Sequence, residues 1–331
     1  MNFRTIAEES RPVGAFAISV SATPFTDFEP QSPEKRDFGP FLFKTGAYLQ
    51  STDPNFGGLS GMQFLDQGKR LLAVSDAGFW LDITIGRDRD GMITGLTAAR
   101  MAPIYSGLGP RLKTPKYYVD AESLVRDGDD LYAAFEEINV IARYRLDLAT
   151  LVMEPEMLPL PESVSQVGDN KGIEALALVP PGQPLAGSLL AIAERGASRA
   201  EPTPGWILSP KGGAGKTVET GTFKVKQSDG FDVTEAVILG NGDLLLLERR
   251  FTVATGVAIR LRRIKASDIT NGALLDGPVL FQAGLAHRID NMEAMALYQN
   301  DQGETVVALL ADDNYSLLQR TVYLEFVLPN G

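Results

Sequence analysis

Short apolar runs separated by turn residues dominate the chain. From about residue 57 onward, runs of strand length follow one another, and Gly, Asp, Asn or Pro interrupts them. Runs of this length between turn residues predict β-strands. No segment of about ten or more residues carries apolar positions at the 3.6-residue spacing of an amphipathic helix. The pattern therefore predicts an all-β protein in which helix is limited to single turns, for example near 266–268.

One short motif, an acid followed by an apolar run, recurs along the chain. Its clearest copy is Gly172-Ile173-Glu174-Ala175-Leu176, and one copy carries Ser60 where the others carry Glu. Self-similarity at a nearly constant period is the signature of a repeat architecture. The key position recurs at intervals of 52 to 62 residues, as Ser60, Glu122, Glu174, Glu235 and Glu293.

Each repeat predicts several strands. The first repeat has predicted strands at 59–64, 70–75, 79–85 and 97–105, and the second at 123–126, 131–135, 140–146 and 153–160. The third has predicted strands at 175–179, 188–193, 206–209 and 222–226, and the fourth at 236–239, 243–247, 257–264 and 277–282. The fifth has only 294–298, 305–310 and 320–328, so it lacks a fourth strand. The segment 41–49 lies just before the first repeat and could supply that strand.

Four antiparallel strands per repeat at this period indicate a β-propeller. We expect five four-stranded blades, closed into a ring by the N-terminal strand. A sixth, degenerate blade formed by residues 1–50 is the alternative. On this interpretation residues 1–331 form a single propeller domain, with 1–54 as the N-terminal segment and closing strand and 55–331 as the repeats.

Composition narrows the possible partners. The 331 residues are 44% hydrophobic and 22% charged, as in a globular protein, and they carry a net charge of −11 with a pI near 4.8. This acidity argues against nucleic acid or an anionic membrane surface as partner. The absence of Cys excludes thiol chemistry and disulfides. No apolar stretch is long enough to span a bilayer, and the mildly apolar segment 13–22 is predicted as a strand rather than a signal peptide.

A second acid accompanies each copy of the motif at the end of the following strand. Because that strand is antiparallel to the first, it ends where the first began, so both acids of a repeat lie at the same end of their blade. If the first strand is innermost, as in propellers generally, these acids face the mouth of the central channel. This second set comprises Asp76, Glu136 (or its neighbour Glu137), Glu194, Glu248 and Asp312, and further acids precede the motif at Asp120, Asp169, Asp232 and Asp290.

So many carboxylates at one mouth cannot all stay ionised without compensation. Clustered carboxylates suit a hard cation such as Ca²⁺ or Mg²⁺, and we expect Asp76, Glu122, Glu136, Glu194, Glu248 and Asp312 to hold it. Basic side chains near the mouth would bind an anionic group, and the candidates are Lys171, Arg195, Arg249 and Arg320. In the alternative, architectural interpretation, the acids cap loop amides or pair with neighbouring arginines.

Two other patterns were tested for chemistry. The segment 212–217 looks like a phosphate-binding loop, but Pro210 stands where the pattern needs Gly, and the residues that follow are strand-like, so we interpret it as a hairpin loop. A Ser-His-acid triad could use only the single histidine, His287, which precedes Glu293 by six residues and could reach the mouth.

Several motifs together resemble the family called "esterase-like activity of phytase". They are Phe56-Gly57-Gly58-Leu59-Ser60-Gly61, Leu72-Ala73-Val74-Ser75-Asp76, Asn170-Lys171-Gly172-Ile173-Glu174-Ala175, Phe231-Asp232-Val233-Thr234-Glu235-Ala236, Asn291-Met292-Glu293-Ala294-Met295 and the segment from Asp312 to Thr321. The resemblance runs from about residue 55 to the C-terminus. It implies a propeller-like bacterial domain, often exported, so a periplasmic or secreted location, and it implies ester or phosphoester hydrolysis supported by Asp and Glu.

The residues and the resemblance together favour a metal-dependent hydrolase of a phosphoester or carboxylic ester. Its small anionic or ester substrate would bind at the mouth, with Glu174, Glu235, Glu293, Ser60 and His287 as candidate catalytic residues. Two alternatives stay open: a non-catalytic propeller that binds a ligand or a protein at its mouth, and a sugar-lactone hydrolase that uses one central cation. The oligomeric state is not predicted.

Overall fold

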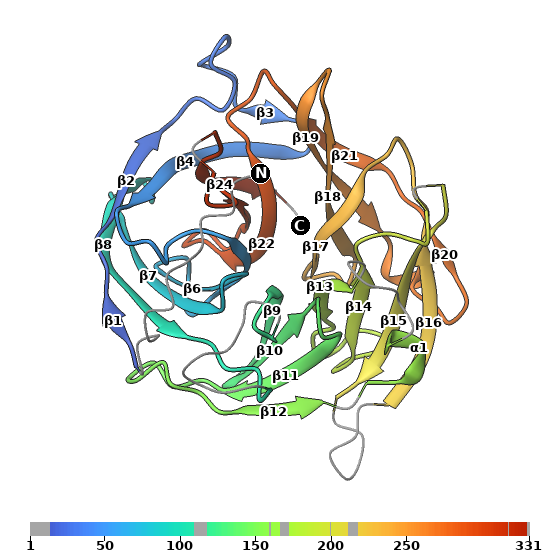
Figure 1. The fold of residues 1–331 in the computed structure, drawn as a ribbon. Helices are drawn as coiled ribbons and strands as arrows, with labels where there is room; N and C mark the ends of the chain where they lie inside the picture. The colour runs from blue at the N-terminus through green and yellow to red at the C-terminus, as the bar shows by residue number, and fades with distance from the viewer. Residues whose placement is uncertain are drawn as a thin grey trace.

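Five small sheets surround a central axis in the computed structural model of the chain (Figure 1). The structure describes residues 14–108, 118–158, 160–165, 172–198, 200–210, 218–316 and 318–329. From the axis outward, the first blade has β5 (Leu59–Phe64), β6 (Arg70–Ser75), β7 (Phe79–Arg87) and β8 (Ile93–Pro103). The second has β9 (Ala121–Asp127), β10 (Asp130–Phe135), β11 (Val140–Arg145) and β12 (Pro155–Leu158).

The third and fourth blades follow the same antiparallel order. The third has β13 (Ile173–Leu178), β14 (Leu189–Ala193), β15 (Thr203–Ser209) and β16 (Val218–Val225), with β20 (Leu274–Leu275) parallel to β16 at its outer edge. The fourth has β17 (Asp232–Ile238), β18 (Leu244–Thr252), β19 (Gly256–Ile264) and β21 (Val279–Ala283). Helix among the described residues consists of α1 (Glu162–Ser165), a 3-10 turn (Ala266–Asp268) at the position expected from the sequence, and 3-10 geometry at Tyr118.

The fifth blade contains strands from both ends of the chain. It has β22 (Asn291–Gln299), β23 (Thr305–Asp312) and β24 (Thr321–Leu328), and β4 (Phe41–Ser51) pairs antiparallel with β24 as the fourth strand. The prediction of five blades closed by an N-terminal strand is therefore confirmed. The six-bladed alternative is wrong, because the other N-terminal strands join existing blades. β2 (Val20–Phe25) and β3 (Asp37–Phe38) pair with β4, and β1 (Phe16–Ala17) pairs with β8.

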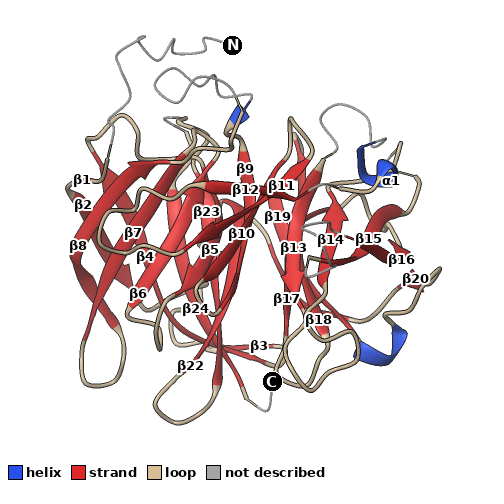
Figure 2. Cartoon of the chain, turned by 90° about the horizontal axis from the view of Figure 1, so that it is seen from below, coloured by secondary structure: helices blue, strands red, loops and turns tan. Residues whose placement is uncertain are grey.

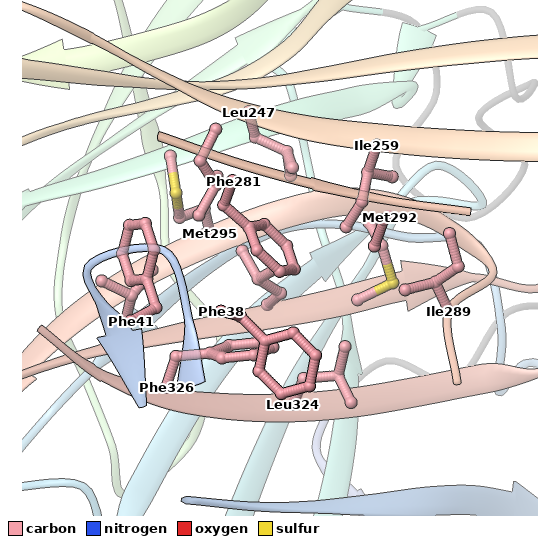
Figure 3. Packing of buried hydrophobic residues seen from close by; sticks show 14 of the residues in the cluster. Phe38, Phe41, Leu247, Ile259, Phe281, Ile289, Met292, Met295, Leu324 and Phe326 are labelled. Carbon is pink, nitrogen blue, oxygen red and sulfur yellow. The ribbon is translucent and has the colours of Figure 1, made fainter. Parts of the chain in front are cut away.

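Apolar side chains fill the spaces between neighbouring blades. Each of five buried clusters joins two adjacent blades, including the pair formed by the fifth and first blades, so the ring is closed by packing as well as by pairing. Figure 3 shows the cluster between the fourth and fifth blades, where Phe281 and Phe326 lie with ring centroids 5.3 Å apart. Burial of both sheet faces explains why most strands are continuous apolar runs.

Three of the buried carboxylates in the described residues pair with arginines in the interior of the protein. Asp82 on β7 contacts Arg70 and Arg100 from the two neighbouring strands. Glu325 on β24 contacts Arg87 and accepts hydrogen bonds from two tyrosines. Glu248 on β18 contacts Arg260 and Arg262 on β19. Each acid is almost fully buried. The pairs of Asp82 and Glu248 lie within the first and fourth blades, whereas the pair of Glu325 joins the fifth blade to the first.

The five innermost strands run between the two rims of the molecule and contact each other around the axis. They are β5, β9, β13, β17 and β22, and they are in contact in that order around the ring. Figure 2, a view from the side, shows the strands standing next to one another between the rims. No helix of the described residues has the length and apolar character needed to cross a membrane. The rim at which the inner strands begin carries the repeated acids.

Candidate functional site

A β-bulge opens the inner strand of every blade. The pairing between the first and second strands skips one residue at each bulge, and these bulge positions are Ser60, Glu122, Glu174, Thr234 and Glu293. A bulge leaves its extra residue unpaired and re-aims its side chain, and bulges are frequent next to functional sites. In the fourth blade the bulge residue is Thr234, because Glu235 pairs with Leu247. In the fourth blade, the residue at the bulge therefore lies one position before the glutamate of the sequence motif.

The second strand of each blade places another polar residue beside the bulge. These second-strand positions are Asp76, Glu136, Glu194, Arg249 and Asp312. In the first and second blades, the backbone N–H groups of Asp76 and Glu136 donate to Gly58 and Asp120, at 2.7 and 3.1 Å. In the fourth blade Arg249 pairs with Asp232, whereas Glu248 pairs with Val233. Arg249 thus takes the place of the acid found in the other four blades. We call the bulge positions and second-strand positions together the acidic mouth.

Burial and mutual repulsion raise the pKa values of the acidic side chains at the mouth. Burial is the main cause of the raised pKa of Glu122, and the carboxylates of Glu174 and Asp120 add to it. For Glu174 burial again comes first, followed by the charges of Glu136 and Glu194. Burial and the nearby Glu194 raise the pKa of Glu136 to about 7. These acids thus hold protons, or need a cation, under conditions in which an exposed carboxyl is fully ionised.

Two arginines offset the charge on one side of the mouth. The guanidinium of Arg249 contacts Asn291 and lies 2.8 Å from a carboxylate oxygen of Glu293. Burial raises the pKa of Glu293, and Arg249 opposes that rise. Arg195 contacts its neighbour Glu194 and lies 3.9 Å from Asp232. Arg195 belongs to the third blade and Arg249 to the fourth blade.

The second blade contains a possible metal site. The carboxylates of Asp120, Glu122 and Glu136 offer oxygen atoms that all lie within 4.8 Å of one another. Beside them, the buried side-chain oxygen of Asn139 has no hydrogen-bond partner in the described part of the chain. A Cβ on Gly172 would lie 2.8 Å from this oxygen and 2.6 Å from the carbonyl oxygen of Glu136, so only glycine fits there. This set of oxygens fits a hard cation such as Ca²⁺ or Mg²⁺.

Three of the candidate residues lie away from the acidic mouth. Glu248 is buried with Arg260 and Arg262, at 2.7 and 2.5 Å, inside the fourth blade. His287 packs its ring against Phe28 with the centroids 4.9 Å apart, and it lines a hollow of about 390 Å³ at the edge of the fourth blade. Arg320 is half-exposed and lies over the ring of Tyr48. Lys171 and the loop 212–217 lie outside the described residues.

Two candidate residues lie below the surface of the mouth. Glu235 is buried and accepts hydrogen bonds from the hydroxyl of Ser123, at 2.9 Å, and from the backbone of Ala236. It therefore links the inner strands of the second and fourth blades. Ser60 is also buried, and its hydroxyl donates to the carbonyl of Gly58 at 3.3 Å. Neither side chain is exposed to a substrate at the mouth.

The raised pKa values predict how stability depends on pH in the metal-free protein. A carboxyl whose pKa is raised by folding stabilises the fold fully below its unfolded pKa near 4.5 and loses that contribution as the pH rises through the folded value. The pKa of Asp82 is lowered, so its contribution to the free energy of unfolding changes only at lower pH. In EDTA, the free energy of unfolding should therefore fall between pH 5 and pH 8, as measured with urea. Saturating Ca²⁺ should remove most of this fall, and a flat profile in EDTA would contradict the prediction.

Comparison with known proteins gives one extensive sequence match. The family model described as "Phytase-like: Esterase-like activity of phytase" matches residues 54–315. No curated protein matches the sequence significantly. Among solved structures, the glutaminyl cyclase of Myxococcus xanthus is 10% identical, with a TM-score of 0.44 over 96% of this chain and 97% of that one.

Two sugar dehydrogenases have comparably low sequence identities and TM-scores. A glucose dehydrogenase is 14% identical, with a TM-score of 0.47 over 85% of this chain and 99% of that one. The PQQ-bound aldose sugar dehydrogenase of Streptomyces coelicolor is 12% identical, with a TM-score of 0.41 over 96% of this chain and 100% of that one.

Proposed function

We propose a function from the premise that the chain belongs to the Phytase-like family, described as having the esterase-like activity of phytase. The protein hydrolyses a phosphoester or carboxylic ester at the acidic mouth, with a divalent cation bound in the second blade. The observation that carries this proposal is the convergence of Asp120, Glu122 and Glu136 within 4.8 Å. On the same premise we propose that the protein is exported to the periplasm or secreted.

The cation site has a defined set of protein ligands. Asp120, Glu122 and Glu136 would hold Ca²⁺ or Mg²⁺, and the buried oxygen of Asn139 lies close to Glu136. A cation held there would supply Lewis-acid chemistry, polarising an ester oxygen and offsetting negative charge. Its three carboxylate ligands leave the acids of the other blades for proton transfer. Ca²⁺ is the first candidate, because its flexible coordination tolerates a site assembled from loop and strand-end residues.

Glu174 is the candidate general base. No described residue donates a hydrogen bond to its carboxylate, and burial together with the charges of Glu136 and Glu194 raises its pKa. A raised pKa makes a carboxylate a stronger base, and the positive charge of Arg249 opposes its protonation. Glu174 accepts a proton from the attacking water, the water oxygen bonds to the phosphorus or carbonyl carbon, and the ester bond to the alcohol breaks. The proton then passes from Glu174 to the departing alcohol oxygen.

Arg195 and Arg249 provide the positive charge for an anionic substrate. They extend from neighbouring blades towards the carboxylates of Glu194 and Glu293, and their side chains keep 29% and 25% of their exposure. An incoming phosphate or carboxylate can share these guanidinium groups, which suit bidentate recognition of oxyanions. The anionic end of the substrate thus binds on the side of the third and fourth blades.

Hydrolysis assays test the proposal. The purified protein should hydrolyse p-nitrophenyl phosphate, phytate or p-nitrophenyl acetate in Ca²⁺, and EDTA should stop the reaction. Glu174→Gln should lower kcat by about 10²- to 10⁴-fold while the protein still binds Ca²⁺. The matched control is Glu156→Gln, since Glu156 is half-exposed on the outer strand of the second blade. No turnover of any of the three compounds, with no Ca²⁺ binding by calorimetry, would overturn the proposal. Ligand binding without turnover would instead indicate a non-catalytic propeller.

A further inference from the structure

The loop after β23 holds an aromatic side chain at the edge of the acidic mouth. Tyr315 follows Asp312 by three residues and keeps 42% of its surface exposed. Its hydroxyl donates to the carbonyl oxygen of Gly57 at 3.1 Å, which lies on the chain that leads into the first blade. Tyr315 therefore bridges the fifth and first blades at the rim. The side of the mouth opposite this seam is the third blade, which carries Arg195.

The ring of Tyr315 is held against two glycines. A Cβ on Gly57 or on Gly58 would lie 3.0 Å from a ring carbon, so any other residue would push the ring away. The carboxylate of Asp313 accepts hydrogen bonds from the backbone N–H of Tyr315 and from the hydroxyl of Thr321, both at 3.1 Å. The two glycines and the hydrogen bond from its backbone N–H to Asp313 thus fix the position of Tyr315. The exposed part of the residue faces solvent.

The backbone at this loop is strained. Asn314 and Tyr315 have φ values of 47° and 50°, so two successive residues other than glycine adopt the left-handed conformation. Such residues cost free energy and persist only where the surroundings fix them, and they cluster at functional sites. A half-exposed ring gains only part of the free energy of burial. Packing between the fifth and first blades therefore does not by itself offset the free-energy cost of the strained backbone at Tyr315.

The charges around Tyr315 restrict what can bind to it. The carboxylates of Asp76 and Asp312 lie near its ring, since their charges add to the effect of burial in raising the pKa of the tyrosine hydroxyl. An anionic group would be repelled from this side and attracted to Arg195 in the third blade, on the opposite side of the mouth. Leu318, on the same loop, is 93% exposed. An uncharged, flat or ring-shaped group is the best match for this edge.

We propose that Tyr315 is a stacking platform for an uncharged ring in the alcohol or acyl part of the ester substrate. The anionic end of that substrate reaches Arg195 across the mouth. This inference rests on the proposed function and narrows its substrate class to esters that carry a ring. It also ranks substrates: a singly phosphorylated ring compound fits better than a ring that carries charge on every side.

Two phosphonates test the platform without any turnover, because ester hydrolysis does not break their C–P bond. Calorimetry in Ca²⁺ should show that the wild-type protein binds phenylphosphonate about tenfold or more tightly than methylphosphonate. Tyr315→Phe should keep this preference, and Tyr315→Leu should remove it while methylphosphonate affinity stays unchanged. Phe251→Leu is the matched control, since Phe251 is an aromatic residue that is 62% exposed on β18, and it should leave the preference intact.

Three results would overturn the platform: no preference in the wild-type protein, the same preference in Tyr315→Leu, or no binding of either phosphonate. The thermal midpoint of Tyr315→Leu, measured alongside, shows whether the variant is folded. Assays with p-nitrophenyl phosphate separate this inference from the proposed function. A ring preference without turnover would reject hydrolysis and keep the platform, whereas turnover without a ring preference would reject only the platform.

Discussion

Glu122→Gln is expected to weaken Ca²⁺ binding by at least about 100-fold, because it removes a charged ligand from the group of three carboxylates in the second blade. Even residues that only orient a metal ligand typically contribute about 10- to 100-fold to metal affinity, so the loss of a ligand should cost more. Glu122 also lies among the charges of Glu174, Asp120, Glu293 and Asp76, which together with burial raise its pKa. Calorimetric titration of the EDTA-treated protein with Ca²⁺ measures the effect.

The same substitution should stabilise the metal-free protein. Glutamine has nearly the shape of glutamate but no charge, so it relieves repulsion that the metal-free mouth must otherwise bear at neutral pH. In EDTA at pH 8, the thermal midpoint of Glu122→Gln should therefore lie above that of the wild type. In Ca²⁺ the order should reverse, since a ligand that binds only the folded protein stabilises it by mass action. Glu156→Gln should change neither measurement. An unchanged Ca²⁺ affinity in Glu122→Gln would exclude the second-blade site.

The period of the repeats and the closing strand could be predicted from the sequence because both depend on local patterns. Apolar runs between turn residues located the first and second strands of the blades to within a few residues; β5 and β6, for example, have the predicted bounds. The missing fourth strand of the last repeat pointed to the segment around 41–49, which forms most of β4. Burial on both faces makes strands of this kind easy to detect, since little depends on which side chain faces which blade.

The offset in the fourth blade could not be predicted in this way. Thr234 and Glu235 are adjacent and polar, and either could occupy the bulge position in a local reading of the chain. The choice depends on the pairing of β17 with β18 and on the hydrogen bonds that Glu235 accepts from Ser123, 112 residues away. The same shift exchanges Glu248 for Arg249 at the second-strand position. A one-residue change of register moves every side chain of a strand to the other face, so the error alters the chemistry completely.

Long-range packing also determined the positions of the remaining candidates. The spacing of His287 from Glu293 was compatible with the mouth, but the aromatic cluster around Phe28 and Phe38 holds its ring in the space between blades. The possible metal site needs Glu136, at the end of the next strand, to lie beside Asp120 and Glu122, and this depends on strand pairing. Tyr315 was visible in the sequence only as part of a family motif, because its exposure and its contact with Gly57 and Gly58 require the closed ring.

Glu248→Gln is expected to lower the free energy of unfolding by about 3–5 kcal/mol, the cost of removing one partner from a buried ion pair. The carboxylate of Glu248 lies 2.7 Å from Arg260 and 2.5 Å from Arg262, and all three side chains are at most 2% exposed. Glutamine keeps the shape but leaves two buried guanidinium groups without their shared counter-charge. The more exposed Asp229 and Asp276 lie 3.2 and 3.4 Å from the two arginines and can compensate only in part. Urea unfolding at pH 7 measures the loss.

Calcium binding distinguishes this structural role from the ligand role that the sequence suggested for Glu248. If Glu248 serves only the interior of the fourth blade, Glu248→Gln should lose stability and keep its Ca²⁺ affinity, the opposite of the pattern expected for Glu122→Gln. Both substitutions remove one charge from a glutamate without changing its shape, so each serves as the control for the other. A Glu248→Gln protein that unfolds like the wild type but binds Ca²⁺ weakly would contradict the register of the fourth blade. It would then place Glu248, rather than Arg249, among the side chains of the acidic mouth.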